Sequence, residues 1–227
     1  MLSIEEHERV LAIRMSREIL GYELARTFVY LIDGLLIDTG PPKWGDQLVK
    51  IISDHEIKLI VNTYYASENI GNNALLQRTF SVPIKAHKEA AERIRHPRQK
   101  GVVMRWLRGQ PPPSKVSKLK NHLRFKDYYY KVLETPGVGP GHICLFEPER
   151  RWLFSGRLLT KKEMKSDREA KDLARDLKRV LSLEPATVFC ADQGVLIDGL
   201  SAIESKLRTV ELGIGNEIWD DAWSLSN

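Results

Sequence analysis

The sequence predicts an α/β fold (α+β in some schemes), with helices covering the outer faces of β-sheets. The first observation is the order of elements: strands, then alternating strands and helices, then hairpins, then a final strand and helix. The second is a continuous apolar run at residues 57–63, typical of a strand covered on both faces. The third is size, because 227 residues with 42% hydrophobic content favour one domain spanning residues 1–227.

The first half of the chain alternates between strand and helix patterns. β-branched and aromatic residues predict strands at residues 9–15, 26–32, 35–40, 57–63 and 82–86. Helical patterns cover residues 44–55, 72–80 and 87–95. Asp33 and Gly34 form the dipeptide of a tight turn between the second and third strands.

The second half begins with a Pro- and Lys-rich stretch at residues 96–121, which we expect to be an insertion or lid. Hairpins are predicted at residues 123–134 and 142–156, and a last strand at residues 187–191. An amphipathic helix is predicted at residues 166–183, with Ser166 as its N-cap, and a final helix at residues 197–207.

Positive charge is concentrated in residues 85–131, which hold 14 Lys and Arg against three acids. The region carries about +11 and the rest of the chain about −6, for a total of +5. Such a region indicates either solvated surface or a surface for an anionic partner such as nucleic acid, with Lys115, Lys118 and Lys120 as candidate contacts. The tyrosines at 128–130 would then stack on bases, or alternatively pack into the core of a hairpin.

The two cysteines, Cys144 and Cys190, lack CxxC spacing and are typical of buried thiols in a reducing compartment. The N-terminus lacks the features of a signal peptide, and no apolar run approaches the roughly 20 residues of a membrane helix. The sequence therefore predicts a cytoplasmic protein without a membrane segment.

Four segments have the order and turn residues of one known family. They are VYLIDGLLIDTG, LIVNTYYASENIGNNALLQRTFSVPIKAHKEAAERI, VLETPGVGPGHICLFEPERRWLFSGRLL and VFCADQGVLIDG. Through them, over about residues 9–208, the chain resembles the metallo-β-lactamase superfamily, most of all its glyoxalase II-like hydrolases. The resemblance implies a four-layer αβ/βα sandwich.

The resemblance also aligns eight residues with the positions that bind metal in the family. The His-x-His-x-Asp-His motif falls on Tyr64, Ala66, Glu68 and Asn69, the next His on Val138, the metal-bridging Asp on Arg157, and the last His on Asp192 or Gln193. We call these eight residues the remodelled site. The turn-forming glycines and prolines around them remain, so the resemblance implies that a metal site was lost.

The side chains of the remodelled site are unsuitable for zinc, which needs deprotonated nitrogen, sulfur or oxygen donors. Ala66 and Val138 offer no donor atom, and Asn69 offers a weak one. Arg157 adds a permanent cation that repels metal ions. Oxygen atoms of Tyr64, Glu68 and Asp192 are a thin set even for a hard cation. We therefore expect no metal and no cofactor.

Three residues have expected structural roles. Arg157 is predicted to form an ion pair with Glu68, or with Asp192, that fills the former metal site; the alternative is a surface Arg157 over a closed cleft. His142 is expected to form local hydrogen bonds, and Asp38 to orient the backbone.

Three functions are consistent with the sequence. The first is a non-catalytic protein that binds a small molecule or a protein partner through the remodelled cleft. The second is an ester, thioester or phosphodiester hydrolase with a non-standard site, in which Tyr64 and Arg157 bind an oxyanion and Glu68 is the base. The third is a nucleic-acid-binding protein that uses residues 85–131. Because family members often dimerise, a homodimer is a further expectation.

Overall fold

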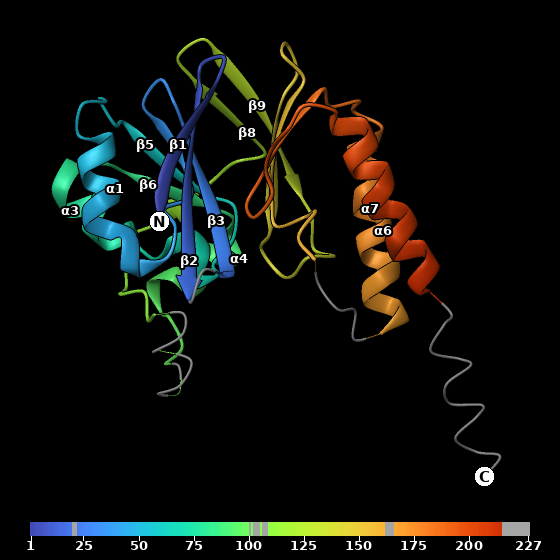
Figure 1. The fold of residues 1–227 in the computed structure, drawn as a ribbon, viewed down its shortest axis with the longest axis horizontal. Coiled ribbons are helices and arrows are strands. Elements are labelled where there is room, and N and C mark those ends of the chain that lie inside the picture. The colour runs from blue at the N-terminus through green and yellow to red at the C-terminus, as the bar shows by residue number, and fades with distance from the viewer. Residues whose placement is uncertain (20–21, 100, 102–104, 106–108, 162–165, 215–227) are drawn as a thin grey trace.

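The computed structural model describes residues 1–19, 22–99, 101, 105, 109–161 and 166–214. Two sheets face each other, and helices cover the outer face of each (Figure 1). This is the predicted four-layer αβ/βα sandwich, so the expected fold class is confirmed.

The first sheet combines an antiparallel and a parallel part. It contains, in spatial order, β1 (Leu2–His7), β2 (Val10–Ile19), β3 (Tyr22–Ile32), β4 (Leu35–Ile37), β5 (Leu59–Asn62), β6 (Ile84–Ala86) and β7 (Ser117–Lys118). The first four strands pair antiparallel and the last four pair parallel. Asp33 and Gly34 both adopt positive φ between β3 and β4, which confirms the predicted tight turn.

The second sheet is mostly antiparallel. It contains, in spatial order, β13 (Gly194–Leu196), β12 (Thr187–Cys190), β11 (Trp152–Gly156), β10 (Ile143–Glu147), β9 (Tyr128–Glu134) and β8 (His122–Phe125). Of these described strands, only β11 and β12 pair parallel. Every residue of β10, β11 and β12 is buried, as expected for strands that are covered on both faces.

The helices lie outside the sheets. They are η1 (Pro42–Trp44), α1 (Gly45–Ile52), α2 (Ser67–Ile70), α3 (Asn73–Phe80), α4 (Lys88–Arg95), α6 (Asp167–Leu181) and α7 (Gly199–Gly213). The Ser166 side chain accepts a hydrogen bond from the Glu169 backbone N–H, which confirms the predicted N-cap of α6. None of the helices that the structure describes combines the length and apolar character needed to cross a membrane.

Three hydrophobic clusters hold the four layers together. The central cluster joins the facing sides of the sheets and includes Tyr30, Tyr130, Trp152 and Phe154. A second cluster packs the first sheet against α1, α3 and α4, and a third packs the second sheet against α6 and α7. Tyr128 and Tyr130 are buried while Tyr129 is half-exposed, so the core-packing interpretation of the tyrosine run is confirmed.

The structure also contains three strands that the sequence patterns did not predict: β1, β7 and β13. Each lies at an edge of the sheets and contains few buried residues. The predicted insertion at 96–121 includes residues 100, 102–104 and 106–108, which lie outside the described residues. Whether it acts as a lid, and whether residues 1–227 form one domain, stay predictions.

Candidate remodelled metal site

The loops that carry the remodelled site meet at one edge of the two sheets. β4 and β5 run parallel, so the residues that follow them, Asp38 and Thr63, lie at the same edge. In the second sheet β10 begins and β11 ends there, which places His142 and Arg157 beside them. The Ile143 backbone N–H donates to the Thr63 carbonyl at 2.9 Å and joins the sheets at this edge.

The half of this edge that comes from the first sheet is organised around the buried carboxylate of Asp38. The Thr63 backbone N–H donates to Oδ1 at 2.8 Å, and the Thr63 hydroxyl donates to Oδ2 at 2.6 Å. The Asn69 amide donates a third hydrogen bond, to Oδ2 at 2.8 Å. Burial raises the pKa of Asp38 to about 6, even though these donors and the Arg157 charge oppose the shift. The expectation that Asp38 orients the backbone is confirmed.

A neighbouring polar network fixes the start of α3. The Thr39 hydroxyl donates to the Asn73 side chain at 3.0 Å, and Asn73 exchanges amide hydrogen bonds with Asn62. The Asn72 amide donates to the carbonyls of Thr39 and Pro41, at 2.6 and 2.9 Å. Amide and hydroxyl groups therefore fix the shape of this loop.

The half that comes from the second sheet is organised around the buried imidazole of His142. Its Nε2 accepts a hydrogen bond from the Arg157 backbone N–H at 2.9 Å, and its Nδ1 lies 2.6 Å from the Thr135 hydroxyl. Because Nε2 is an acceptor, the neutral ring carries its proton on Nδ1 and donates it to Thr135. Burial, together with the Arg157 charge, lowers the pKa of His142 to about 3. The expected local role of His142 is confirmed.

Gly156 lies between the two halves. Its φ is +52°, and a Cβ added to it would lie 2.8 Å from His142 Nε2 and 2.8 Å from Thr63 Oγ1. A side chain at this position would therefore displace both hydrogen-bonding centres. Glycine is needed at position 156 because it lets His142 and Thr63 approach the backbone closely and because it adopts a left-handed conformation.

Tyr64, at the first aligned ligand position, covers the second half of the edge. Its ring lies 5.4 Å from the His142 ring in an edge-to-face arrangement, and a Cβ added to Gly139 would lie 2.3 Å from its hydroxyl oxygen. The hydroxyl donates to Tyr65 at 3.2 Å. Burial raises the pKa of Tyr64, so the phenol is neutral at ordinary pH.

Arg157 is half-buried at the end of β11. Its charge opposes the rise in the pKa values of Asp38 and Tyr64 and adds to the fall in the pKa of His142. The guanidinium therefore influences the remodelled site. The predicted ion pair is wrong: among the described residues, no ion pair joins Arg157 to Glu68 or to Asp192. The hydrogen bonds that the structure records for Arg157 are made by its backbone: its N–H donates to His142, and its carbonyl accepts from the Thr160 N–H at 3.2 Å.

The other aligned residues serve the surrounding structure. Val138 packs against the outer hydrophobic cluster of the second sheet. Asp192 accepts a hydrogen bond from the Cys190 thiol at 3.2 Å, and the exposed Gln193 donates to the Leu159 carbonyl at 2.9 Å. Ala66 precedes α2 as its N-cap residue, and Glu68 lies half-buried in the first turn of that helix.

These side chains do not fit the metal ions that bind at this place in the fold family. The Asn69 amide hydrogens are used by Asp38 and Thr63, and its buried oxygen has no donor within the described part of the chain. A lone amide oxygen is a poor site for a divalent ion. Over the described ranges, no group of three or more His, Cys, Asp or Glu side chains is placed to hold a metal.

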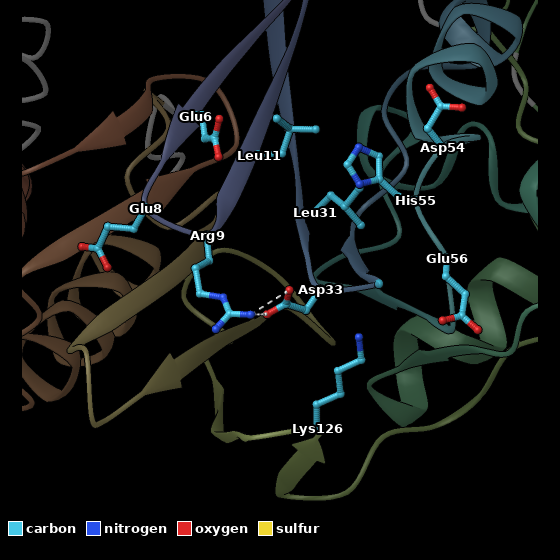
Figure 2. A pocket seen from close by; sticks show the side chains of 11 residues that line it. Glu6, Glu8, Arg9, Leu11, Leu31, Asp33, Asp54, His55, Glu56 and Lys126 are labelled. Atoms are coloured by element: carbon cyan, nitrogen blue, oxygen red, sulfur yellow. Dashed lines mark hydrogen bonds and ion pairs between the residues drawn. The ribbon is translucent and has the colours of Figure 1, made fainter.

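A pocket of about 540 Å³ lies at the opposite end of the strands, at the amino ends of β4 and β5. Figure 2 shows the acidic side chains around it and the ion pair between Arg9 and Asp33. The Tyr128 hydroxyl also donates to Asp33, at 2.7 Å, and this hydrogen bond is the main reason that the pKa of Asp33 is lowered. None of the eight residues of the remodelled site, all of them described, lines this pocket.

The structure separates the lysines that the sequence grouped as anion contacts. The backbone of Lys115 exchanges hydrogen bonds with the Gln77 side chain, and Lys115 lines a pocket with Arg78 and Arg95. Lys118 and Lys120 line a different pocket, together with residues of β9 and α6. The sequence could not show this division, because it depends on the path of the chain through β7.

Sequence reasoning missed Thr63 and Thr135, which bond to Asp38 and His142. Neither residue stood at an aligned ligand position, and each contact joins positions whose pairing depends on the fold. A threonine at the end of a predicted strand, or directly after it, is the signal that could have identified them.

The four-layer sandwich, with its loops gathered at one edge, defines the fold class. Comparison with known proteins gives the family. Residues 24–192 match the model of the metallo-beta-lactamase superfamily. This match covers most of the chain, and the protein belongs to the metallo-beta-lactamase superfamily.

Solved structures show the same fold at low sequence identity. The metallo-beta-lactamase family protein TTHA1429 from Thermus thermophilus superposes with a TM-score of 0.68 at 18% identity, covering 90% of this chain and 80% of that one. A metallo-beta-lactamase from Pontibacter korlensis gives 0.69 at 16% identity, covering 93% and 99%. TTHA1623, solved in a di-iron-bound form, gives 0.62 at 24% identity, covering 79% and 93%. These similarities establish the fold alone.

The chain is also similar to a curated protein of Aquifex aeolicus (strain VF5) that is described as uncharacterized. It is 28% identical over 131 residues, which cover 57% of this chain and 61% of the relative. The match therefore spans less than two thirds of the relative's length.

Proposed function

We propose that this protein is a non-catalytic member of the superfamily, which binds a small molecule or a protein partner at the remodelled site without a metal ion. The observation that carries the proposal is Arg157, a half-buried guanidinium at the position where the family has a metal-bridging carboxylate. Metal-dependent hydrolysis needs a metal-activated water, and this residue repels the metal.

Arg157 also indicates what is bound. Its charge reaches Asp38, Tyr64 and His142, but no carboxylate of the described residues lies within ion-pair distance of it. A guanidinium in this position suits a ligand or partner that presents a carboxylate or another planar anion. The two buried thiols, Cys144 and Cys190, are free and support a reducing compartment such as the cytoplasm.

Elemental analysis of protein purified without chelator or a metal-binding affinity tag tests the proposal. We expect far less than one equivalent of zinc, iron or manganese, both as purified and after incubation with these ions and desalting. We also expect no turnover of thioesters, lactones or phosphodiesters. One retained equivalent of a transition metal, or metal-dependent turnover, would overturn the proposal.

A variant with the family's ligand types gives the matched comparison. It carries Tyr64→His, Ala66→His, Glu68→Asp, Asn69→His, Val138→His and Arg157→Asp, and it leaves Asp192 and Gln193, the two candidates for the last His position, unchanged. We expect it to retain zinc if it folds, whereas the same set with Arg157 left in place should retain much less, because the cation remains. Circular dichroism of both variants checks the fold, and equal zinc binding by the two would contradict the role given to Arg157.

The hydrolase alternative predicts a different response. If Glu68 acted as a base beside an oxyanion held by Tyr64 and Arg157, Glu68→Gln would abolish turnover while leaving ligand binding intact. Under our proposal there is no turnover to lose, and Arg157→Gln instead weakens the binding of carboxylate ligands. Differential scanning fluorimetry with small mono- and dicarboxylates separates these outcomes.

A further inference from the structure

A pocket of about 320 Å³ lies where the chain crosses from the first sheet to the second, between β7 and β8. Its charged side chains are Lys88, Lys118, Lys120, Arg179 and Glu134, and the ring of His87 also lines it. We call it the lysine pocket. The lining comes from the start of α4, the crossing segment, β9 and α6, so residues distant in sequence converge on it.

The backbone around the lysine pocket is fixed by hydrogen bonds. The Leu119 N–H donates to the Ala86 carbonyl at 2.8 Å, and the Val132 N–H donates to the Asn121 carbonyl at 3.0 Å. These bonds attach the crossing segment to β6 on one side and to β9 on the other. Lys118 and Lys120 therefore extend from a segment that is held at both ends.

The lysines of the pocket lack counter-charges from the described part of the chain. Over the described residues, no carboxylate lies within ion-pair distance of the ammonium groups of Lys88, Lys118 or Lys120. Lysines elsewhere do find partners: Lys58 lies 3.1 Å from Glu56, and Lys178 lies 2.8 Å from Glu211. Three uncompensated cations around one pocket are a match for an anionic ligand.

The remaining charged groups of the pocket are held in place. Arg179 donates to the Glu134 carbonyl oxygen, so its guanidinium is fixed at the pocket wall. Among the described residues of the lining, Glu134 is the only carboxylate, and its Oε1 lies 3.2 Å from His87 Nε2. Arg179 also forms an ion pair with Asp176, at 3.4 Å, so the excess charge comes from the three lysines, and three lysines against Glu134 leave the pocket positive.

From this geometry we propose that the lysine pocket binds a phosphate-bearing ligand. Lys supplies point charges and Arg a planar fork, and this combination is typical of phosphate sites. A volume of about 320 Å³ is at the lower end of the size range of small-molecule sites. The phosphate comes from a free phosphorylated metabolite or from the backbone of single-stranded nucleic acid. The inference does not depend on the function proposed for the remodelled site.

The test compares two triple variants of the full chain. The first, Lys88→Ala with Lys118→Ala and Lys120→Ala, removes the uncompensated charges. The control, Lys50→Ala with Lys58→Ala and Lys178→Ala, removes the same number of charges away from the pocket. All six lysines are exposed, so both variants should fold. Isothermal titration calorimetry with pyrophosphate and ATP, at fixed salt, measures the affinities.

We expect the first variant to bind pyrophosphate and ATP at least tenfold more weakly than the wild type, and the control to bind them about as well as the wild type. Glu134→Gln, which removes the acid from the lining, should tighten binding severalfold. Equal losses in both triple variants would show non-specific charge attraction and overturn the proposal. Absence of binding by the wild type would overturn it as well.

A competition experiment identifies the source of the phosphate. Fluorescence anisotropy follows a labelled single-stranded oligonucleotide as pyrophosphate is added. Binding that pyrophosphate displaces, with a salt slope that is lower in the first variant than in the control, supports nucleic acid as the source. Tight ATP binding without oligonucleotide binding supports a free metabolite.

Discussion

The two halves of the edge that carries the remodelled site are each organised around one buried side chain, an acid in the first half and a base in the second. The half from the first sheet places a carboxylate, Asp38, among three hydrogen-bond donors. The half from the second sheet places an imidazole, His142, between one donor and one hydroxyl. Burial disfavours the charged form of both, and it therefore raises the pKa of Asp38 to about 6 and lowers that of His142 to about 3. The comparison shows that each half is organised by hydrogen bonds to one buried titratable side chain.

The largest expected effect on stability comes from removing the side chain of Asp38 or that of His142. Asp38→Ala leaves two donors of Thr63 and one of Asn69 buried and unpaired, and puts Ala at a φ of +61°. We expect the free energy of unfolding to fall by about 3–5 kcal/mol, since each unpaired buried group costs about 1–3 kcal/mol. His142→Ala leaves fewer groups unpaired and should cost about 2–4 kcal/mol. Urea denaturation measures both.

Asp38→Asn is the control for this prediction. Asn retains one oxygen acceptor and tolerates the left-handed backbone, so its cost should be well below that of Ala. If Asp38→Ala cost less than His142→Ala, the first half would not be the more strongly hydrogen-bonded of the two.

The pH dependence of stability should separate the two halves. The pKa of Asp38 rises from 3.8 to about 6 on folding, so stability falls as pH rises between these values, by about 3 kcal/mol in total. The pKa of His142 falls from 6.5 to about 3, so stability falls as pH drops from 6.5 towards 3, by about 5 kcal/mol. Between about pH 4 and 6 the two contributions oppose each other.

Single variants reveal each contribution. Relative to Asp38→Asn, the wild type should lose stability as pH rises from 4 to 6. Relative to His142→Gln, the wild type should gain stability over the same range. Urea denaturation at half-unit pH steps measures both differences. If both differences had the same sign, the opposite shifts assigned to the two halves would be wrong.

The smallest effect is expected at Arg157, which lies between the halves. The hydrogen bond to His142 comes from the Arg157 backbone, so Arg157→Gln keeps it. We expect the free energy of unfolding to change by less than about 1 kcal/mol, as for most half-exposed charges. The pKa of Asp38 and that of His142 should both rise, because a nearby cation is removed. Titration of His142 by nuclear magnetic resonance measures the second shift, and no rise would place the guanidinium away from the site.

Much of the fold followed from local patterns in the sequence. The run at 57–63 predicted a covered strand, and β5 (Leu59–Asn62) is buried throughout. The pattern at 166–183 predicted α6 (Asp167–Leu181), including its Ser166 cap. The edge strands β1, β7 and β13 were not predicted, because they have weak apolar patterns and form mainly by pairing with a neighbour.

The sequence by itself determined the strand and helix order, and the glycines and prolines that shape the loops. It also determined the residue types at the remodelled site, which exclude a conventional set of zinc ligands. Only the tertiary structure decided which groups meet: Thr63 with Asp38, Arg157 with His142 through its backbone, and Lys118 apart from Lys115. The physical reason is that hydrogen bonds and charge contacts act over a few ångströms, and the sequence does not give those distances until the sheets bring the loops together.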